Sequence, residues 1–332
     1  MRTTETGTIL AKKAAPAVSV IMPAYACTEY IGDALKSVFA QTFDDYEIIV
    51  VNDGSPDTPE LERALKPYRE RIVYLRQENR GVSAARNAAI RVARAPLVAM
   101  LDPDDLWEPD YLTLQVAAML RDLRLEIIYP NALIFGDGLD AGKTFMEVNP
   151  SDGEVTFERL ITRQCTVVNY VIARREAIIR VGWFDEDLHR SEDFDLWLRI
   201  LLDGGRIAYQ RKVLARYRKR KGSLSSDHVL LTSDTLRVFD KLARIPSLTM
   251  DQRSLVKKER QHFHAVLRFK EGKRAFQNGD VRSAKECLRE ANEFFRSRKT
   301  SLVLLLLRVA PRLLVRVYGL RDRFVFRLST RI

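Results

Sequence analysis

Short apolar runs alternate with amphipathic or Ala-rich segments along the first third of the chain. The apolar runs have the length and composition of buried strands, and they cover residues 18–22, 47–51, 72–76 and 97–101. The segments between them predict helices over residues 30–41, 57–68 and 81–95. Strands that alternate with helices at this spacing predict an α/β fold, with a mainly parallel sheet and helices on both faces.

The rest of the chain shows a weaker alternation. Strands are predicted over 127–135, 167–174 and 207–217, and helices over 111–120, 177–181 and 194–202. Residues 137–153 are typical of a variable loop, and 217–225 form a basic loop. Residues 228–293 are predicted to be helical, and 268–291 resemble one tetratricopeptide-like hairpin. Because one such hairpin cannot bury its own face, we expect it to pack on the first domain or on a partner.

The segment 98–107, VAMLDPDDLW, places three carboxylates directly after a buried strand. Pro103 offers no N–H to a ladder, so it stops the strand and leaves the acids on a turn. Open α/β sheets bind ligands at this end of their strands. Crowded hard oxygens suit Mg²⁺ or Mn²⁺, and such ions share their ligand shell with substrate phosphates. A solvated acidic turn that caps the next helix is the alternative, and this run alone does not decide between them.

Two other loops are expected at the same edge of the sheet. Pro23 closes the first strand and leads into Ala24 and Tyr25, and Asp53 follows the second strand. The sequence holds neither GxGxxG nor GxxxxGK[ST], so neither a dinucleotide fold nor a P-loop is indicated. Carboxylates on base and ribose, with a metal on the diphosphate, could still hold a nucleotide.

The net charge of +11 is concentrated at the C-terminal end. From Arg296 onward the chain has ten Lys and Arg against one acid, Asp322, which gives +9 of that +11. The remainder is nearly neutral, so we expect no nucleic-acid partner. Three scattered cysteines without a CxxC pair fit a reducing cytosol and argue against a zinc site. The N-terminal residues 1–16 are polar and have no apolar core of signal-peptide length.

Residues 302–318, LVLLLLRVAPRLLVRVY, carry Arg308, Arg312 and Arg316 on one helical face, with a kink expected at Pro311. A basic amphipathic helix of this kind is typical of a membrane-surface anchor whose arginines lie on anionic headgroups. A packed C-terminal helix with a solvated basic face is the alternative. The aliphatic run is too short to span a bilayer. We therefore predict a cytoplasmic protein held peripherally on the inner face of the cytoplasmic membrane.

Five ordered pieces of the sequence resemble the family 2 glycosyltransferases. They are VSVIMPAY (18–25), ALKSVFAQTFDDYEIIVVNDGS (34–55), NRGVSAARNAAI (79–90), LDPDD (101–105) and GWFDEDLHRSEDFDLWLRI (182–200). The resemblance covers about residues 18 to 225 and implies a Rossmann-like GT-A fold. The domains are then a loose segment 1–16, a GT-A domain 17–226 with a nucleotide-sugar half 17–107 and an acceptor half 108–226, a helical region 227–300 and the basic tail 301–332.

The resemblance implies roles for the residues of the nucleotide-sugar half. Asp104 is the candidate metal ligand, and Asp102 contacts the ribose or helps to hold Mg²⁺ or Mn²⁺. Asp53 binds the base or the ribose. Arg86 reaches the nucleotide from the helix after the third strand, with an ordinary surface arginine as the alternative. The base is framed by the residues that follow the first strand, Pro23, Ala24 and Tyr25.

On the acceptor half, the resemblance makes Asp193 the base that takes the acceptor's proton, and Glu192 a group that places sugar hydroxyls. Acids in the first turn of a helix are also favoured by its dipole alone, which is the structural alternative. Trp197 offers a stacking face to the acceptor or belongs to the core. Arg220 stands where this family often has a histidine near the phosphates. Arginine cannot ligate a metal, but it can clamp a diphosphate.

The resemblance implies an inverting transferase that moves a sugar from a nucleoside-diphosphate sugar, a UDP-sugar as first choice, to an acceptor hydroxyl. The acceptor is expected to be a saccharide or a lipid-linked glycan of the cell surface. A sugar-phosphate nucleotidyltransferase is one rival, although it usually needs a Gly/Lys-rich phosphate loop that this sequence lacks. A non-catalytic membrane-associated scaffold is the other.

Overall fold

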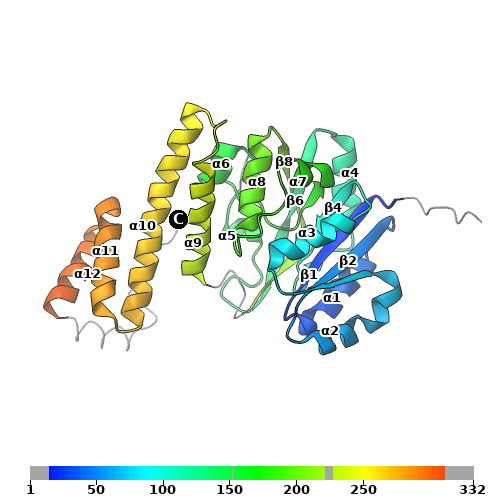
Figure 1. Cartoon of the computed structure of the whole chain (residues 1–332), viewed down its shortest axis with the longest axis horizontal. Coiled ribbons are helices and arrows are strands. Elements are labelled where there is room, and N and C mark those ends of the chain that lie inside the picture. The colour runs from blue at the N-terminus through cyan, green and yellow to red at the C-terminus, as the bar shows by residue number, and fades with distance from the viewer. Residues whose placement is uncertain (1–14, 152, 221–226, 311–332) are drawn as a thin grey trace, which may run out of the picture. The chain divides into compact units, whose positions relative to one another are not determined.

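The computed structural model describes residues 15–151, 153–220 and 227–310. The chain divides into two compact units. The first comprises Met1–Asp187 and Glu192–Arg220, and the second comprises Leu188–Ser191 and Lys221–Ile332. The first unit is an α/β domain and the second is helical (Figure 1).

The described residues of the first unit form one eight-stranded sheet in the order β3-β2-β1-β4-β7-β6-β8-β5. The first four strands in sequence pair in parallel, as do β6 and β8, whereas β7 and β5 pair antiparallel with their neighbours. The predicted α/β class with a mainly parallel sheet is confirmed, with an added antiparallel part. The strands are β1 (Val18–Ala24), β2 (Tyr46–Asp53), β3 (Val73–Gln77), β4 (Leu97–Met100), β5 (Leu106–Trp107), β6 (Leu125–Gly136), β7 (Ile172–Arg174) and β8 (Arg206–Lys219).

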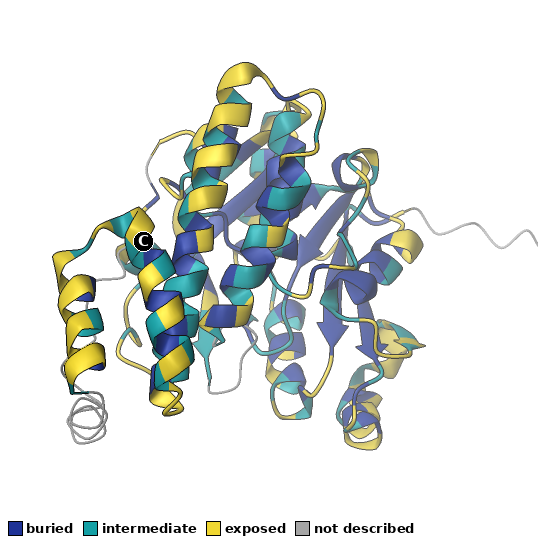
Figure 2. Cartoon of the chain, turned by 60° about the vertical axis from the view of Figure 1, so that its left-hand side comes forward, coloured by how far each residue is buried: buried dark blue, intermediate teal, exposed yellow. Residues whose placement is uncertain are grey.

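Helices cover both faces of this sheet. The strand order runs outward from β1 to β3 and then returns to β4, so right-handed crossovers place α1 and α2 on one face and α3 on the other. Figure 2 shows that the central strands, such as β1 and β4, are buried and that the helices expose their outer sides. The helices of this unit are α1 (Thr28–Phe39), α2 (Thr58–Leu65), η1 (Lys66–Arg71), α3 (Val82–Val92), α4 (Tyr111–Arg121), α5 (Phe145–Val148), α6 (Phe157–Ile161), α7 (Arg175–Arg180) and α8 (Glu192–Leu202).

The missing N–H of Pro23 suggests that this residue closes the first strand, but the structure shows that it does not. It lies inside β1 and pairs with Val51 of β2. Peptide groups alternate in direction along a strand, and the Ile21 carbonyl accepts from Leu101 at 3.1 Å on the β4 side. Pro23 therefore faces the same side, where β4 has already ended and no ladder bond is lost.

Other boundaries also differ from those predicted. The strand predicted over 167–174 is reduced to β7, and the loop predicted over 137–153 contains the short helix α5. A capping box between Thr144 and Glu147 explains this helix. The strand β8 continues to Lys219, so residues 217–219 extend the sheet instead of opening a loop, while residues 221–226 lie outside the described part.

The second unit confirms the predicted helical C-terminal region. Helices α10 and α11 form a hairpin that turns at Asn278–Asp280, and Gly272 of α10 allows the close approach of Leu288. Leu307 of α12 packs against Phe276 and Leu288 of this hairpin. The helices are α9 (His228–Leu242), α10 (Met250–Gln277), α11 (Val281–Phe295) and α12 (Arg298–Val309).

Among the described residues, no helix is long and apolar enough to cross a membrane. Much of the predicted basic tail, residues 311–332, lies outside the described part of the chain.

Candidate active site

The loops after β1 and β2 are tied together at the carboxyl edge of the sheet. The Ala26 N–H donates to the Ser55 hydroxyl at 2.7 Å, and the Thr28 hydroxyl donates to Asp57 at 2.6 Å. Pro23 and Ala24 are buried, whereas the Tyr25 side chain is 49% exposed. The Tyr25 ring therefore stands on a fixed backbone and is open to a ligand.

Asp53 ends β2 and is buried at the same edge. Its Oδ1 accepts from the Arg80 N–H at 3.0 Å and its Oδ2 from the Gly81 N–H at 2.8 Å. The neighbouring Gly54 has φ +64°, and a Cβ there would lie 2.5 Å from the Asn79 nitrogen. Asp53 thus fixes the loop that enters α3 and stays close to the Tyr25 loop.

Arg86 is not an ordinary surface arginine. It is 3% exposed and connects two segments that are far apart in the sequence. One guanidinium nitrogen, Nη2, lies 2.8 Å from Asp102 Oδ1, and Nη1 lies 2.5 Å from Glu192 Oε1. The structure therefore brings the acids after β4 together with the first turn of α8.

The two acids of α8 have different surroundings. Glu192 is buried on Arg86, and burial raises its pKa to about 7, although the guanidinium opposes this rise. Asp193 is partly exposed, and its Oδ1 accepts from the Phe194 N–H at 2.7 Å. Burial raises the pKa of Asp193 too, and the charge of Asp102 adds to the rise while Arg86 opposes it. Asp193 is therefore the more accessible of the two carboxylates and is electrostatically linked to the turn after β4.

Asp104 and Asp105 also follow β4, but their carboxylates have different partners. Asp104 Oδ2 lies 2.7 Å from Nε of Arg220. Asp105 is buried and accepts from the Tyr170 hydroxyl at 2.7 Å and from the Arg218 N–H at 2.7 Å. Asp105 thus anchors β8 to the turn, while Asp104 faces the guanidinium of Arg220.

The carboxylates on the turn after β4 are the candidate ligands of a divalent cation. No cluster of three or more His, Cys, Asp or Glu that could hold a metal occurs in the described part of the chain. Asp102 and Asp104 nevertheless lie two residues apart on one turn. A pair of carboxylates fits Mg²⁺ or Mn²⁺ when the remaining ligands are water and the phosphates of a substrate. The residues therefore fit an ion that binds together with a diphosphate.

Trp197 is 1% exposed, with its ring 6.4 Å from that of Phe184, so the structure favours the core alternative over a stacking face for the acceptor.

Two residues that position the segment before α8 were not predicted from the sequence. Asn87 exchanges hydrogen bonds with the Phe184 backbone at 2.9 and 3.1 Å, and Arg199 donates to the Trp183 carbonyl at 2.8 Å. Together they fix the segment that leads to α8. An Asn inside the Ala-rich helix α3 was the available signal, because Asn is a poor helix former.

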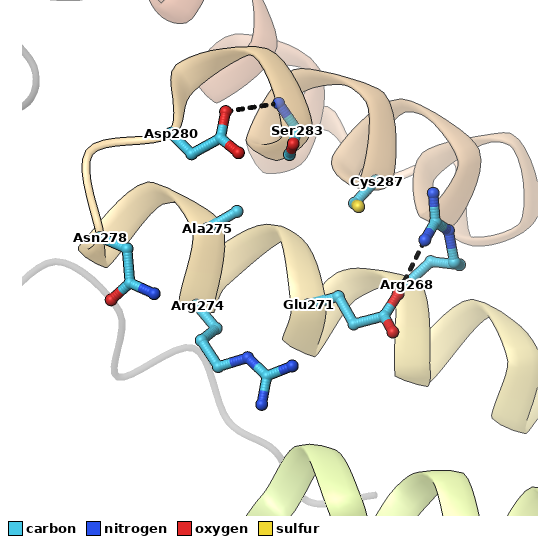
Figure 3. Close-up of a pocket in the computed structure, with 8 residues that line it drawn as sticks. All are labelled: Arg268, Glu271, Arg274, Ala275, Asn278, Asp280, Ser283 and Cys287. Carbon is cyan, nitrogen blue, oxygen red and sulfur yellow. Dashed lines mark hydrogen bonds and ion pairs between the residues drawn. The ribbon is translucent and has the colours of Figure 1, made fainter.

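One pocket lies outside this region, on the α10–α11 hairpin (Figure 3). Arg268 is already paired there with Glu271 at 2.7 Å and with Glu290 at 2.6 Å. None of the residues predicted for the site lines this pocket.

Comparisons with known proteins identify the family of this chain. The sequence profile described as Glycosyl transferase family 2 matches residues 19–186, about half of the chain. The chain therefore belongs to this family, and the family predicted from the resemblance is confirmed.

Several glycosyltransferases are similar in sequence to this chain. The Bacillus subtilis protein "Putative teichuronic acid biosynthesis glycosyltransferase TuaG" is 30% identical over 233 residues, which cover 69% of this chain and 90% of the relative. The Escherichia coli protein "UDP-Glc:alpha-D-GlcNAc-diphosphoundecaprenol beta-1,3-glucosyltransferase WfgD" is 29% identical over 212 residues, 63% of this chain and 80% of the relative. An uncharacterized glycosyltransferase of Rickettsia bellii is 30% identical over 219 residues, 63% of this chain, but the match spans 31% of that longer protein.

Solved structures share the fold. S. aureus TarS 1–349 superimposes with a TM-score of 0.59 at 18% identity, covering 92% of this chain and 91% of TarS 1–349. The mannosyltransferase PcManGT from Pyrobaculum calidifontis, solved with GDP-Man and Mn²⁺, also gives 0.59, at 19% identity, with coverage of 94% and 89%. The predicted GT-A fold is thereby confirmed.

Proposed function

We propose that this protein is an inverting glycosyltransferase that moves a sugar from a nucleoside-diphosphate sugar to an acceptor hydroxyl. The observation that carries the proposal is the Arg86 bridge, which connects Asp102 at the end of β4 with Glu192, the neighbour of Asp193. This bridge supports the proposal that the turn after β4 and the candidate general base Asp193 belong to one site. We extend the proposal to a donor half over 17–107 and an acceptor half over 108–226.

The proposed reaction is a single displacement. The acceptor oxygen forms a bond to the anomeric carbon from the side opposite the leaving group, so the configuration inverts. The bond between this carbon and the diphosphate oxygen breaks, and the nucleoside diphosphate leaves with the electron pair. Asp193 accepts the proton of the attacking hydroxyl. Glu192 is proposed to place sugar hydroxyls with its remaining carboxylate oxygen.

Pro23, Ala24, Tyr25 and Asp53 are proposed to frame the base and ribose, because they end β1 and β2 beside the turn after β4. Arg86 is proposed to act on the nucleotide through Asp102. Asp104 and Asp102 would hold Mg²⁺ or Mn²⁺, which stabilises the charge that develops on a leaving diphosphate. A UDP-sugar is the first choice of donor, since WfgD is named for UDP-Glc and TarS was solved with UDP-GlcNAc.

The acceptor is proposed to be a lipid-linked or cell-surface glycan. The names of TuaG and WfgD, which specify teichuronic acid biosynthesis and a diphosphoundecaprenol acceptor, support this class.

The proposal is tested by incubating the protein with labelled UDP-, GDP-, CDP- and dTDP-sugars in the presence of Mn²⁺. Release of a nucleoside diphosphate from one donor is the expected result. Release of pyrophosphate from a nucleoside triphosphate and a sugar 1-phosphate would instead identify a nucleotidyltransferase. If no donor is turned over and none raises the melting temperature, the non-catalytic scaffold is the better description.

The raised pKa of Asp193 predicts the pH dependence of transfer. A general base works when it is deprotonated, so activity is lost as the pH falls through its pKa. Because burial raises this pKa, the acidic limb of kcat/KM should lie above pH about 4, the ordinary value for Asp. Initial rates between pH 4 and 9 at saturating Mn²⁺ measure the limb. A rate that stays constant down to pH 4 would remove Asp193 from the role of base.

We also propose that the C-terminal end contacts an anionic membrane surface. Helix α12 exposes Leu302, Leu305 and Val309, and the sequence beyond it carries six arginines. The protein should sediment with vesicles containing phosphatidylglycerol but not with phosphatidylcholine vesicles. Replacing Leu305 and Val309 together by Ser should weaken binding by roughly ten-fold, because apolar area is lost from the contact.

The matched control for this experiment is Leu123→Ser, which changes a leucine of the first unit that is also exposed. Equal sedimentation of the control and the double variant, or equal binding to neutral vesicles, would contradict the membrane proposal.

A further inference from the structure

Arg218, near the end of β8, and Arg220, directly after this strand, lie beside the acidic turn, and one aromatic ring contacts both. The Cζ atoms of Arg218 and Arg220 lie 4.9 and 5.4 Å from the centroid of the Tyr30 ring. Tyr30 belongs to the first turn of α1, directly after the loop that carries Tyr25. A guanidinium within about 6 Å of an aromatic centroid is attracted to the ring. Tyr30 therefore holds both cations next to the candidate nucleotide site.

The two arginines differ in how firmly they are fixed. The Arg218 N–H donates to Asp105 Oδ1 at 2.7 Å, its Nε donates to the Asp104 carbonyl at 2.7 Å, and its Cζ lies 4.5 Å from the centroid of the Phe135 ring. In the described part of the chain, the Arg220 side chain donates from Nε to the Asp104 carboxylate at 2.7 Å. The Arg220 side chain is 29% exposed, so a ligand can approach this pair. Arg220 is thus the guanidinium that is able to change partner.

We propose that Arg220 exchanges Asp104 for the diphosphate of the donor, and that Tyr30 is the positioning residue that holds Arg220 at the turn in both arrangements. This inference rests on the proposed function, since it assumes a nucleoside-diphosphate ligand. Guanidinium groups bind phosphate oxygens in a bidentate manner. The ring contact does not depend on which anion the guanidinium faces, so it can persist while the partner changes.

The exchange has a consequence that a simple binding residue would not have. While the Arg220 guanidinium is paired with the Asp104 carboxylate, it competes with a divalent cation for this carboxylate. Removing the guanidinium should therefore strengthen the binding of Mn²⁺ alone and weaken the binding of UDP. These opposite signs distinguish exchange from a structural role, because a structural loss would weaken both.

The test is isothermal titration of wild type, Arg220→Ala, Tyr30→Leu and Tyr30→Phe with Mn²⁺ alone, and with UDP and UMP in the presence of Mn²⁺. Arg220→Ala should weaken UDP binding by about ten-fold or more, with UMP much less affected, and should tighten Mn²⁺ binding. Tyr30→Leu should shift both affinities in the same directions by about three-fold, and Tyr30→Phe should resemble wild type because it keeps the ring.

Arg216→Ala is the matched control, because this β8 arginine is paired with Glu108 at 2.6 Å and lies outside the set just described. Unchanged or weaker Mn²⁺ binding in Arg220→Ala, or unchanged UDP binding, would overturn the exchange. Tyr30→Leu with wild-type affinities would overturn the role of Tyr30. If wild type binds no UDP but binds GDP, CDP or dTDP, that nucleotide replaces UDP. If it binds none of them, the proposed function fails, whereas the Mn²⁺ titration still decides whether Arg220 competes for Asp104.

Discussion

Replacing Asp193 by Asn is expected to lower the turnover of sugar transfer by about 10²- to 10⁴-fold, the usual contribution of a general base. Asn has nearly the same shape, but its amide cannot accept the proton of the acceptor hydroxyl. UDP binding should remain at the wild-type level, because in our account Asp193 faces the acceptor and not the nucleotide. Initial rates and nucleotide titration measure the two effects separately.

The matched control is Asp203→Asn, just beyond the other end of α8, where the carboxylate forms an exposed pair with Arg180 at 2.6 Å. Exposed pairs of this kind contribute little, so this variant should keep wild-type turnover. If Asp193→Asn retains more than about a tenth of wild-type turnover, another group must take the proton. If it also loses UDP binding, the separation between donor and acceptor sides is wrong.

Replacing Arg86 by Met is expected to destabilise the protein by about 3–5 kcal/mol, because it leaves two carboxylates without their shared cation. Asp102 and Glu192 both face this guanidinium, and Glu192 is buried. For a chain of this size the melting temperature should fall by about 10 °C. Turnover should fall as well, since the bridge fixes the turn after β4 against α8. Thermal and denaturant unfolding measure the loss.

A double variant separates the charge effect from packing. Adding Glu192→Leu to Arg86→Met removes one of the stranded carboxylates, so the double variant should be more stable than Arg86→Met. Arg91→Ala on the same helix is the control, since its contact with Glu186 is a long surface pair at 3.7 Å. An Arg86→Met protein as stable as wild type would mean that the bridge does not hold these segments together.

The sequence predicted the sheet well where apolar runs are continuous. β1, β2 and β4 are buried on both faces, so their pattern has no competing explanation. The prediction for Pro23 is wrong because a proline is excluded only where its N–H would donate to a neighbouring strand. Pro23 faces the β4 side of β1, and the sequence does not show that β4 ends before it reaches Pro23. The strand β5 has two residues, which is too short to produce a pattern, and β7 is shorter than the strand predicted over 167–174.

The residues of the candidate site are predicted from family resemblance, which says nothing about their contacts. Arg86 and Glu192 are 106 positions apart, and no local pattern predicts that a guanidinium in an Ala-rich helix is buried between two acids. The pairing of Arg220 with Asp104 likewise depends on the register of β8 beside β5 and β6. Trp197 sits at a helical spacing that suits both core and site, so only tertiary packing decides between them.

A crystal structure of the protein with UDP and Mn²⁺ tests the central claim most directly. We predict that the uracil lies against Tyr25 and Asp53, that the diphosphate lies beside Asp102, Asp104 and Arg220, and that Asp193 faces the terminal phosphate across a space for one sugar ring. A UDP molecule bound elsewhere, or an Asp193 carboxylate on the far side of the domain from the diphosphate, would contradict the account.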